Sequence, residues 1–161
     1  MSDLLRIGSV GTSAVMDVMQ EAMRLTESVA CSVVYSRSEE KGRAYAKKNG
    51  VPQYCTDYSA LVRRDDVDTV YIASPNTCHV AQALEALNAG KHVIVEKPTA
   101  LTRAEVDLIH EAAVRNGRYF FEAITTLFMP NYLACRDLLP SLGRLDSITI
   151  KYGQYSSKMD D

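Results

Sequence analysis

The sequence lacks an excess of charge of one sign, a long apolar run and closely spaced cysteines. The 161 residues carry a formal net charge of -2 with both signs interspersed, so we expect no nucleic-acid partner. No apolar run approaches the roughly 20 residues that span a bilayer, so we expect no membrane association. The first residues have neither the basic segment nor the apolar stretch of a secretory signal, and we therefore expect a cytoplasmic protein.

The four cysteines, Cys31, Cys55, Cys78 and Cys135, are widely spaced and form no CxxC pair. Neither a metal site nor a disulfide framework is indicated. Cys78 lies near a motif described below, but no group of basic residues accompanies it to activate a catalytic thiol. The remaining composition, 47% hydrophobic and 24% charged, is that of an ordinary globular domain with a substantial core.

Apolar strand patterns alternate with helical patterns along most of the chain. The expected strands are residues 4–10, 29–35, 53–54, 69–73, 92–95 and 119–122. The expected helices are residues 13–27, 38–49, a short one after 57, 77–89 and 102–116. Short strands without polar alternation are typical of a parallel sheet covered on both faces. We therefore expect an α/β fold with a doubly wound parallel sheet, a dinucleotide-binding Rossmann domain, over residues 1–122.

The pattern changes near the end of the chain. Residues 147–152 alternate apolar and polar side chains, which is typical of an antiparallel strand with one wet face. This strand either joins the edge of the first sheet or begins a second α/β domain that the sequence does not contain. We favour the second interpretation, in which residues 123–161 form a linking helix and the first strand of an otherwise absent C-terminal domain.

The turn after the first expected strand departs from the usual glycine pattern of a dinucleotide site. Such a site uses one Gly for the tight turn, a second for close approach of the pyrophosphate and a third for helix–strand packing. Gly11 takes the first role, whereas Ser13 and Met16 replace the other two glycines. The Ser13 hydroxyl can donate to a phosphate oxygen or cap the helix. We expect Gly11, Thr12, Ser13 and Ala14 to bind the cofactor phosphates at the helix N-terminus.

The residues after the second expected strand bear on the cofactor ribose. An Asp or Glu here binds the ribose hydroxyls of NAD, but this chain has Ser36 and Arg37. Arg37 can pair with the 2′-phosphate of NADP, stack on adenine or remain a solvated surface residue. Glu39 and Glu40 follow closely and would weaken a phosphate site. The expected cofactor is NAD or NADP, and Arg37 favours NADP.

Ser74, Pro75 and Asn76 follow the fourth expected strand, and His79 lies one turn into the next helix. In this topology the strand order reverses between the first and fourth strands, which opens the ligand crevice there. Pro75 ends the strand, and Asn76 offers an amide to the ribose or the nicotinamide. His79 either packs at the helix terminus or lines the pocket. We include all four residues among the cofactor-binding candidates.

Glu96, Lys97 and Pro98 follow the strand at residues 92–95 and form the most informative motif. Two charges at the end of a buried strand need a partner or a chemical role, and ligands bind at this edge of a parallel sheet. Lys97 can hold a substrate hydroxyl or carbonyl near the nicotinamide and transfer a proton. The alternative is an ion pair that caps the strand. The Lys97–Pro98 bond is a candidate for the cis form.

Together these motifs resemble the glucose-fructose oxidoreductase / inositol dehydrogenase / rhizopine-catabolism (Gfo/Idh/MocA) family. The resemblance covers essentially the whole chain, and the joint order and spacing of the motifs make it specific. The matching segments are Gly11-Thr12, Tyr35-Ser36-Arg37, Ser74-Pro75-Asn76 with His79, Gly90-Lys91-His92, Glu96-Lys97-Pro98 and Phe121-Glu122-Ala123.

The resemblance implies a longer, two-domain enzyme whose second domain contacts the substrate and forms a homo-oligomer. It also implies that Lys97 is the catalytic or substrate-orienting lysine, with Glu96 and Asn76 near the nicotinamide ribose. The implied reaction is hydride transfer between NAD(P) and a hydroxyl or carbonyl of a sugar-like or polyol substrate. This chain alone is expected to be inactive.

Two alternatives stay open. A non-catalytic relative would bind the dinucleotide as a sensor or regulator, which the intact Lys97 motif disfavours and which Ser13 and Met16 leave open. A methyltransferase could use a similar glycine turn, but it would have an acid at the end of the second strand, where Ser36 and Arg37 stand.

Overall fold

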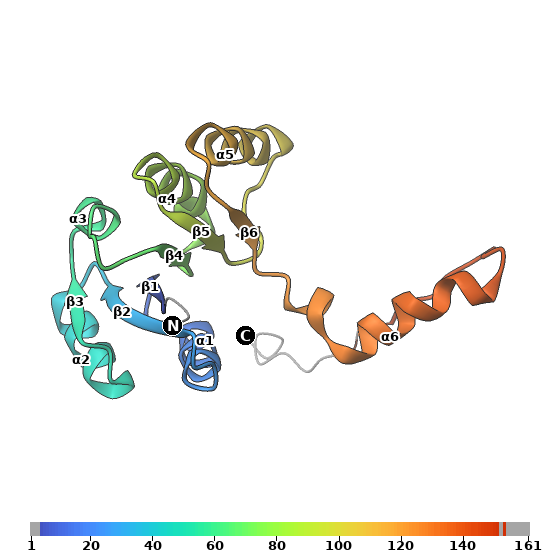
Figure 1. The fold of residues 1–161 in the computed structure, drawn as a ribbon, viewed down its shortest axis with the longest axis horizontal. Helices are drawn as coiled ribbons and strands as arrows, with labels where there is room; N and C mark the ends of the chain where they lie inside the picture. The colour runs from blue at the N-terminus through green and yellow to red at the C-terminus, as the bar shows by residue number, and fades with distance from the viewer. Residues whose placement is uncertain (1–3, 152, 154–161) are drawn as a thin grey trace, which may run out of the picture. The chain divides into compact units, whose positions relative to one another are not determined.

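The computed structural model describes residues 4–151 and residue 153. It contains a 6-stranded sheet of order β3-β2-β1-β4-β5-β6 in which every neighbouring pair is parallel (Figure 1). The strands are β1 (Leu5–Val10), β2 (Val29–Tyr35), β3 (Gln53–Cys55), β4 (Thr69–Ile72), β5 (His92–Val95) and β6 (Phe120–Glu122). The order reverses between β1 and β4, so the predicted doubly wound Rossmann fold is confirmed.

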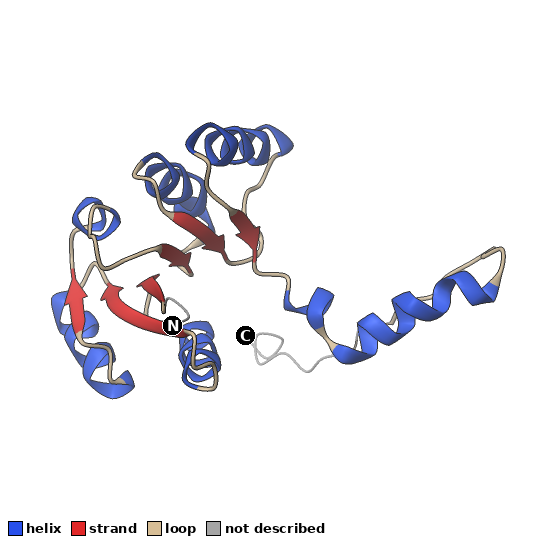
Figure 2. Cartoon of the chain, viewed as in Figure 1, coloured by secondary structure: helices blue, strands red, loops and turns tan. Residues whose placement is uncertain are grey.

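Helices connect the strands and cover both faces of the sheet (Figure 2). The helical elements are α1 (Ala14–Arg24), α2 (Glu39–Asn49), α3 (Tyr58–Val62), α4 (Asn76–Asn88), α5 (Arg103–Asn116), η1 (Thr125–Phe128), α6 (Pro130–Leu138) and η2 (Leu139–Leu142). Local sequence signals set several of their ends. A capping box of Thr102 and Glu105 is present at the start of α5. Gly50 closes α2 in the left-handed conformation, with φ of 67°.

Two clusters of buried side chains hold the helices on the sheet. One joins the strands to α3, α4 and α5, and the other joins them to α1 and α2. Met16 of α1 is fully buried in the second cluster. At this position a dinucleotide fold often has a glycine for close packing, and here the methionine fills the space instead. The replacement therefore does not prevent α1 from packing on the sheet.

The chain separates into two compact units, Met1–Ile124 and Thr125–Asp161. The first unit holds the sheet and helices α1 to α5, and the second holds η1, α6 and η2. The prediction of a strand over residues 147–152 is wrong for 147–151, which have no regular structure, while Tyr152 lies outside the described residues. Ile148 and Ile150 are exposed. An alternating pattern forms a strand only beside a pairing partner, and residues 147–151 do not pair with one another.

Within residues 4–151, no helix is long and apolar enough to cross a membrane.

Candidate cofactor site

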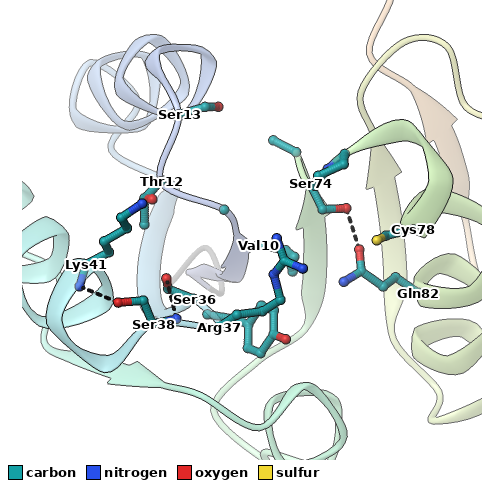
Figure 3. Close-up of a pocket in the computed structure, with 14 residues that line it drawn as sticks. Val10, Thr12, Ser13, Ser36, Arg37, Ser38, Lys41, Ser74, Cys78 and Gln82 are labelled. Atoms are coloured by element: carbon teal, nitrogen blue, oxygen red, sulfur yellow. Dashed lines mark hydrogen bonds between the residues drawn. The ribbon is translucent and has the colours of Figure 1, made fainter.

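A groove of about 340 Å³ lies at the carboxyl edge of the sheet, where the strand order reverses (Figure 3). Its walls come from the ends of β1, β2 and β4, the N-cap of α1, the start of α2 and the first two turns of α4. The lining residues are Val10, Gly11, Thr12, Ser13, Tyr35, Ser36, Arg37, Ser38, Lys41, Ala73, Ser74, Pro75, Cys78 and Gln82. The structure thus brings together many of the predicted cofactor residues from three separate strand ends.

The turn between β1 and α1 forms a cradle that only glycine permits. Gly11 has a φ of +112°, and a Cβ on it would lie 2.8 Å from the Ala73 carbonyl oxygen. Ser13 is the N-cap residue of α1, but its side chain makes no capping hydrogen bond, so its hydroxyl is not committed to the helix. The bare backbone at Gly11 and the N-terminus of α1 suit the diphosphate of a dinucleotide. These residues therefore fit the predicted cofactor.

Two cations line the groove beside the end of β2. Arg37 is exposed and lies against the groove, and Lys41 lines it from the first turn of α2 (Figure 3). The backbone fixes both positions, because Ser38 N donates to Ser36 Oγ at 3.3 Å and Lys41 N donates to Ser38 Oγ at 3.3 Å. The helix N-terminus adds partial positive charge. This wall is suited to a phosphate group.

The acidic residues expected to weaken this phosphate site lie outside it. Neither Glu39 nor Glu40 lines the groove. Glu39 Oε1 instead accepts a hydrogen bond from Arg43 at 2.6 Å and another from the Tyr54 hydroxyl at 3.2 Å. Arg43 therefore offsets the charge of Glu39 on the far side of α2.

The third wall comes from the end of β4 and from α4. Ser74 and Pro75 line it as predicted, together with Cys78 and Gln82 of the helix. Tyr35 forms part of the groove from the end of β2, and burial raises the pKa of its phenol above the ordinary value. The phenol is therefore neutral at physiological pH and adds no charge to the groove.

His79 does not line the groove, although it was a candidate for doing so. Its ring is buried, with Nδ1 2.9 Å from the Pro98 carbonyl oxygen and Nε2 2.8 Å from the Ser74 carbonyl oxygen. The packing alternative describes it better, because the ring holds the loop after β4 to the loop after β5. Ala14 and Asn76 begin α1 and α4, are exposed and do not line the groove either.

Glu96 and Lys97 emerge from β5, the next strand after β4 in the sheet, and lie outside the groove lining. Glu96 Oε1 accepts a hydrogen bond from the buried Tyr71 hydroxyl at 2.5 Å, and its Oε2 accepts one from Lys97 N at 3.3 Å. Burial, and then this bond, raise the pKa of Tyr71, which keeps the phenol a donor. Among the described residues the Glu96 and Lys97 side chains form no ion pair, so the strand-capping alternative is wrong. The Lys97–Pro98 bond is cis.

Sequence reasoning missed several residues of the groove. Lys41 and Ser38 were overlooked although Lys41 stands three residues after an N-cap serine, within the first turn of a helix. Gln82 was overlooked although it lies four residues after Cys78, so both occupy one face of α4. Those two spacings were the available signals.

The fold, the glycine cradle and the cationic wall define a dinucleotide-binding domain. Residues 5–123 match the family model GFO_IDH_MocA, described as an oxidoreductase family with an NAD-binding Rossmann fold. The chain belongs to this family, and the resemblance seen in the sequence is confirmed. Its cofactor is NAD or NADP, and an adenosylmethionine-dependent methyltransferase is not supported.

Named relatives and solved structures agree with this assignment. The chain is 36% identical over 157 residues to scyllo-inositol 2-dehydrogenase (NADP(+)) IolU of Bacillus subtilis, covering 98% of this chain and 48% of that protein. It is 35% identical over 136 residues to dTDP-3,4-didehydro-2,6-dideoxy-alpha-D-glucose 3-reductase of Streptomyces violaceoruber, covering 84% and 40%. The 3-ketoreductase KijD10 of Actinomadura kijaniata, solved with NADP and TDP-benzene, superposes with a TM-score of 0.81 at 26% identity, covering 86% and 43%. The chain spans about half the length of the curated relatives it matches.

Proposed function

We propose that this protein is the nucleotide-binding part of an oxidoreductase that transfers hydride between NADP and a hydroxyl or carbonyl of a sugar-like or polyol substrate. The observation that carries the proposal is the state of Lys97. Its neighbour Glu96 is held by Tyr71, and the exposed lysine stands at the sheet edge where parallel α/β sheets bind ligands. Within residues 4–151 and 153 this lysine has no carboxylate partner, which suits it to hydrogen-bond a substrate oxygen.

The proposed roles divide among the residues at this edge. Bound NADP would supply the hydride acceptor at nicotinamide C4. Lys97 Nζ would hold the substrate hydroxyl and accept its proton during oxidation, or donate a proton to the carbonyl oxygen during reduction. Glu96 and Asn76 would contact the nicotinamide ribose.

The preference for NADP rests on Arg37 and Lys41. Both line the groove beside the end of β2, and no acid stands where an NAD-specific site binds the ribose hydroxyls. A guanidinium and an ammonium together suit a dianionic 2′-phosphate. The Bacillus subtilis relative is named for NADP, and KijD10 was solved with NADP.

The proposed division of the chain follows the resemblance. Residues 1–122, with Gly11, Thr12, Ser13, Ala14, Ser36, Arg37, Ser74, Pro75, Asn76, His79, Glu96 and Lys97, would form the cofactor-binding domain. Residues 123–161 would link it to a substrate-binding and oligomerisation domain of the kind that the resemblance implies. Assembly as a homo-oligomer and a cytoplasmic location remain predictions.

Isotope transfer tests the proposal. The full-length protein, with the substrate-binding domain that the resemblance implies, is incubated with NADPH deuterated at nicotinamide C4 and a panel of keto sugars, because this chain alone is expected to be inactive. Deuterium in the alcohol products is measured by mass spectrometry. Transfer to a member of the panel supports the proposal. Tight NADPH binding without transfer to any member would favour a sensor or regulator, and the absence of NADPH binding would contradict the cofactor assignment.

A further inference from the structure

Gln82 presents an amide to the groove in a fixed orientation. The Ser74 hydroxyl donates to Gln82 Oε1 at 2.6 Å, so the amide oxygen is occupied from the β4 side (Figure 3). The Gln82 backbone carbonyl accepts a hydrogen bond from the Tyr58 hydroxyl at 2.6 Å, which ties this turn of α4 to α3. Both the helix position and the side-chain orientation of Gln82 are therefore set by neighbours.

In this orientation the Gln82 amide presents its hydrogen-bond donors to the groove. With Oε1 held by Ser74, the Gln82 amide nitrogen is turned into the groove, toward the side of Arg37 (Figure 3). Within the described residues the side chain of Gln82 forms a hydrogen bond through Oε1 and none through Nε2. The amide N–H groups are therefore available to a ligand that carries an acceptor.

The order of the groove walls places the cofactor base against Gln82. The diphosphate belongs at Gly11 and Ser13, and the adenosine ribose belongs beside Ser36 at the end of β2. The base is attached to that ribose through N9, so the edge of adenine that carries N1 points away from the ribose. The wall opposite β2 is α4, where Gln82 lies.

We propose that Gln82, oriented by Ser74, selects adenine by donating an N–H hydrogen bond to N1 of the ring. Adenine N1 is an acceptor, whereas hypoxanthine carries a hydrogen at N1 and would face the amide with a donor. To accept that hydrogen, the Gln82 amide must turn over. Its N–H would then donate to the Ser74 hydroxyl oxygen, and the Ser74 hydroxyl hydrogen would lose Oε1 as its acceptor, which opposes the turn. This inference rests on the proposed binding of the dinucleotide in this groove.

The affinities of two cofactors test this role directly. NADPH and the reduced nicotinamide hypoxanthine dinucleotide phosphate differ only in the base and are each titrated by calorimetry. For the wild-type protein we expect NADPH to bind about tenfold more tightly than the hypoxanthine cofactor. The Gln82 amide can donate to N1 of adenine, whereas N1 of hypoxanthine presents a second donor to the amide. In Gln82→Glu a carboxylate replaces the amide, so both cofactors bind more weakly, and the ratio should fall to about one or reverse.

The ratio of the two affinities separates base recognition from general charge effects. An added negative charge repels both phosphorylated cofactors alike, so it cancels in the ratio. Gln53→Glu is the matched control, because Gln53 begins β3 outside the groove and its Oε1 accepts a hydrogen bond from Arg64 at 2.7 Å, which Glu preserves. This variant should keep the wild-type ratio.

Two further variants keep the inference open to refutation. Gln82→Met removes the donor without adding charge and should also reduce the ratio to about one, and Ser74→Ala should reduce it partly by releasing the amide. An unchanged ratio in both Gln82→Glu and Gln82→Met would overturn the role of Gln82 while leaving the cofactor site intact. Failure of the wild-type protein to bind either cofactor would instead overturn the proposed site, and this inference with it.

Discussion

The carboxyl edge of the sheet has two sides that differ in how completely they are formed. The phosphate side, comprising Gly11, Ser13, Arg37 and Lys41, lines a groove whose backbone is fixed by a positive φ and by local hydrogen bonds. The lysine side, centred on Lys97, is exposed and lies outside that groove. In the proposed function, this domain holds its cofactor by the first side and offers chemistry from the second. Substitutions should therefore separate affinity from turnover.

The largest effect is expected from Lys97→Met on the lysine side. In the full-length protein, loss of a group that transfers a proton in the reaction should lower kcat about 100- to 10,000-fold, measured by NADPH oxidation with a substrate found by isotope transfer. The affinity for NADPH should stay within about twofold of wild type, because Lys97 does not line the groove. Lys47→Met, an exposed position on α2, is the control. A wild-type kcat in Lys97→Met would show that the lysine side has no role in the mechanism.

On the phosphate side, Gly11→Ala should abolish most cofactor binding. The new Cβ would meet the Ala73 carbonyl oxygen at 2.8 Å, and φ of +112° is unfavourable for any residue with a Cβ. We expect about 100-fold weaker NADPH binding by calorimetry, and a loss of about 1–3 kcal/mol in the free energy of unfolding. Gly50→Ala, also at positive φ but with no atom within 4 Å of its Cβ, should lose stability and keep its affinity. Equal NADPH affinities for Gly11→Ala and Gly50→Ala would contradict a role of the Gly11 turn in cofactor binding.

Replacement of the two cations should change the choice of cofactor. Arg37→Ala should weaken NADPH binding about tenfold or more through loss of a charge-assisted contact to the 2′-phosphate, while NADH binding changes less than about threefold. Lys41→Ala should also weaken the binding of NADPH more than that of NADH, but by a smaller factor, because an ammonium lacks the paired donors of a guanidinium. Arg63→Ala, exposed at the end of α3, is the control. A parallel loss of both cofactors in Arg37→Ala would point to adenine stacking instead.

The smallest effect is expected from Asp68→Asn, at the opposite edge of the sheet from both sides. Arg6 donates two side-chain hydrogen bonds to Asp68, and they hold the pKa of that carboxyl below its ordinary value. A lowered folded-state pKa stabilises the protein above the unfolded value near 4, and the contribution is lost as the pH falls through the folded-state pKa. Asp68→Asn should therefore be less stable to urea at pH 7 and should converge with wild type in acid. A difference in stability between Asp68→Asn and wild type that is the same at all pH values would contradict this origin. The affinity for the cofactor should not change.

The sequence predicted the elements well where local chemistry specifies them. Val29–Tyr35 and His92–Val95 form the strands expected from their apolar runs. Ser38 and Thr102, the first residues of two expected helices, are the N-caps of those helices. The strand over residues 147–151 was wrong because alternation describes a face and cannot supply a partner.

The site residues also differ in whether the local sequence specifies them. Gly11 and Arg37 were predictable because the topology brings the ends of parallel strands to one edge. Lys41 and Gln82 lie inside helices, where only the rotation of the helix decides which side chains meet the groove. The sequence left two roles open for His79, because its ring contacts Pro98, 19 residues away, which no local pattern reveals.

The His79 ring joins the two sides of the edge in a way that has a thermodynamic meaning. One imidazole touches the carbonyl of Ser74, a groove residue, and the carbonyl of Pro98, which follows Lys97. A cofactor that shifts the first loop must displace the second, or else lose one of these contacts. If cofactor binding moves the first loop, occupation of the groove and the placement of Lys97 become reciprocally linked: the effect of the cofactor on the lysine would equal the effect of a lysine-bound substrate on the cofactor's affinity.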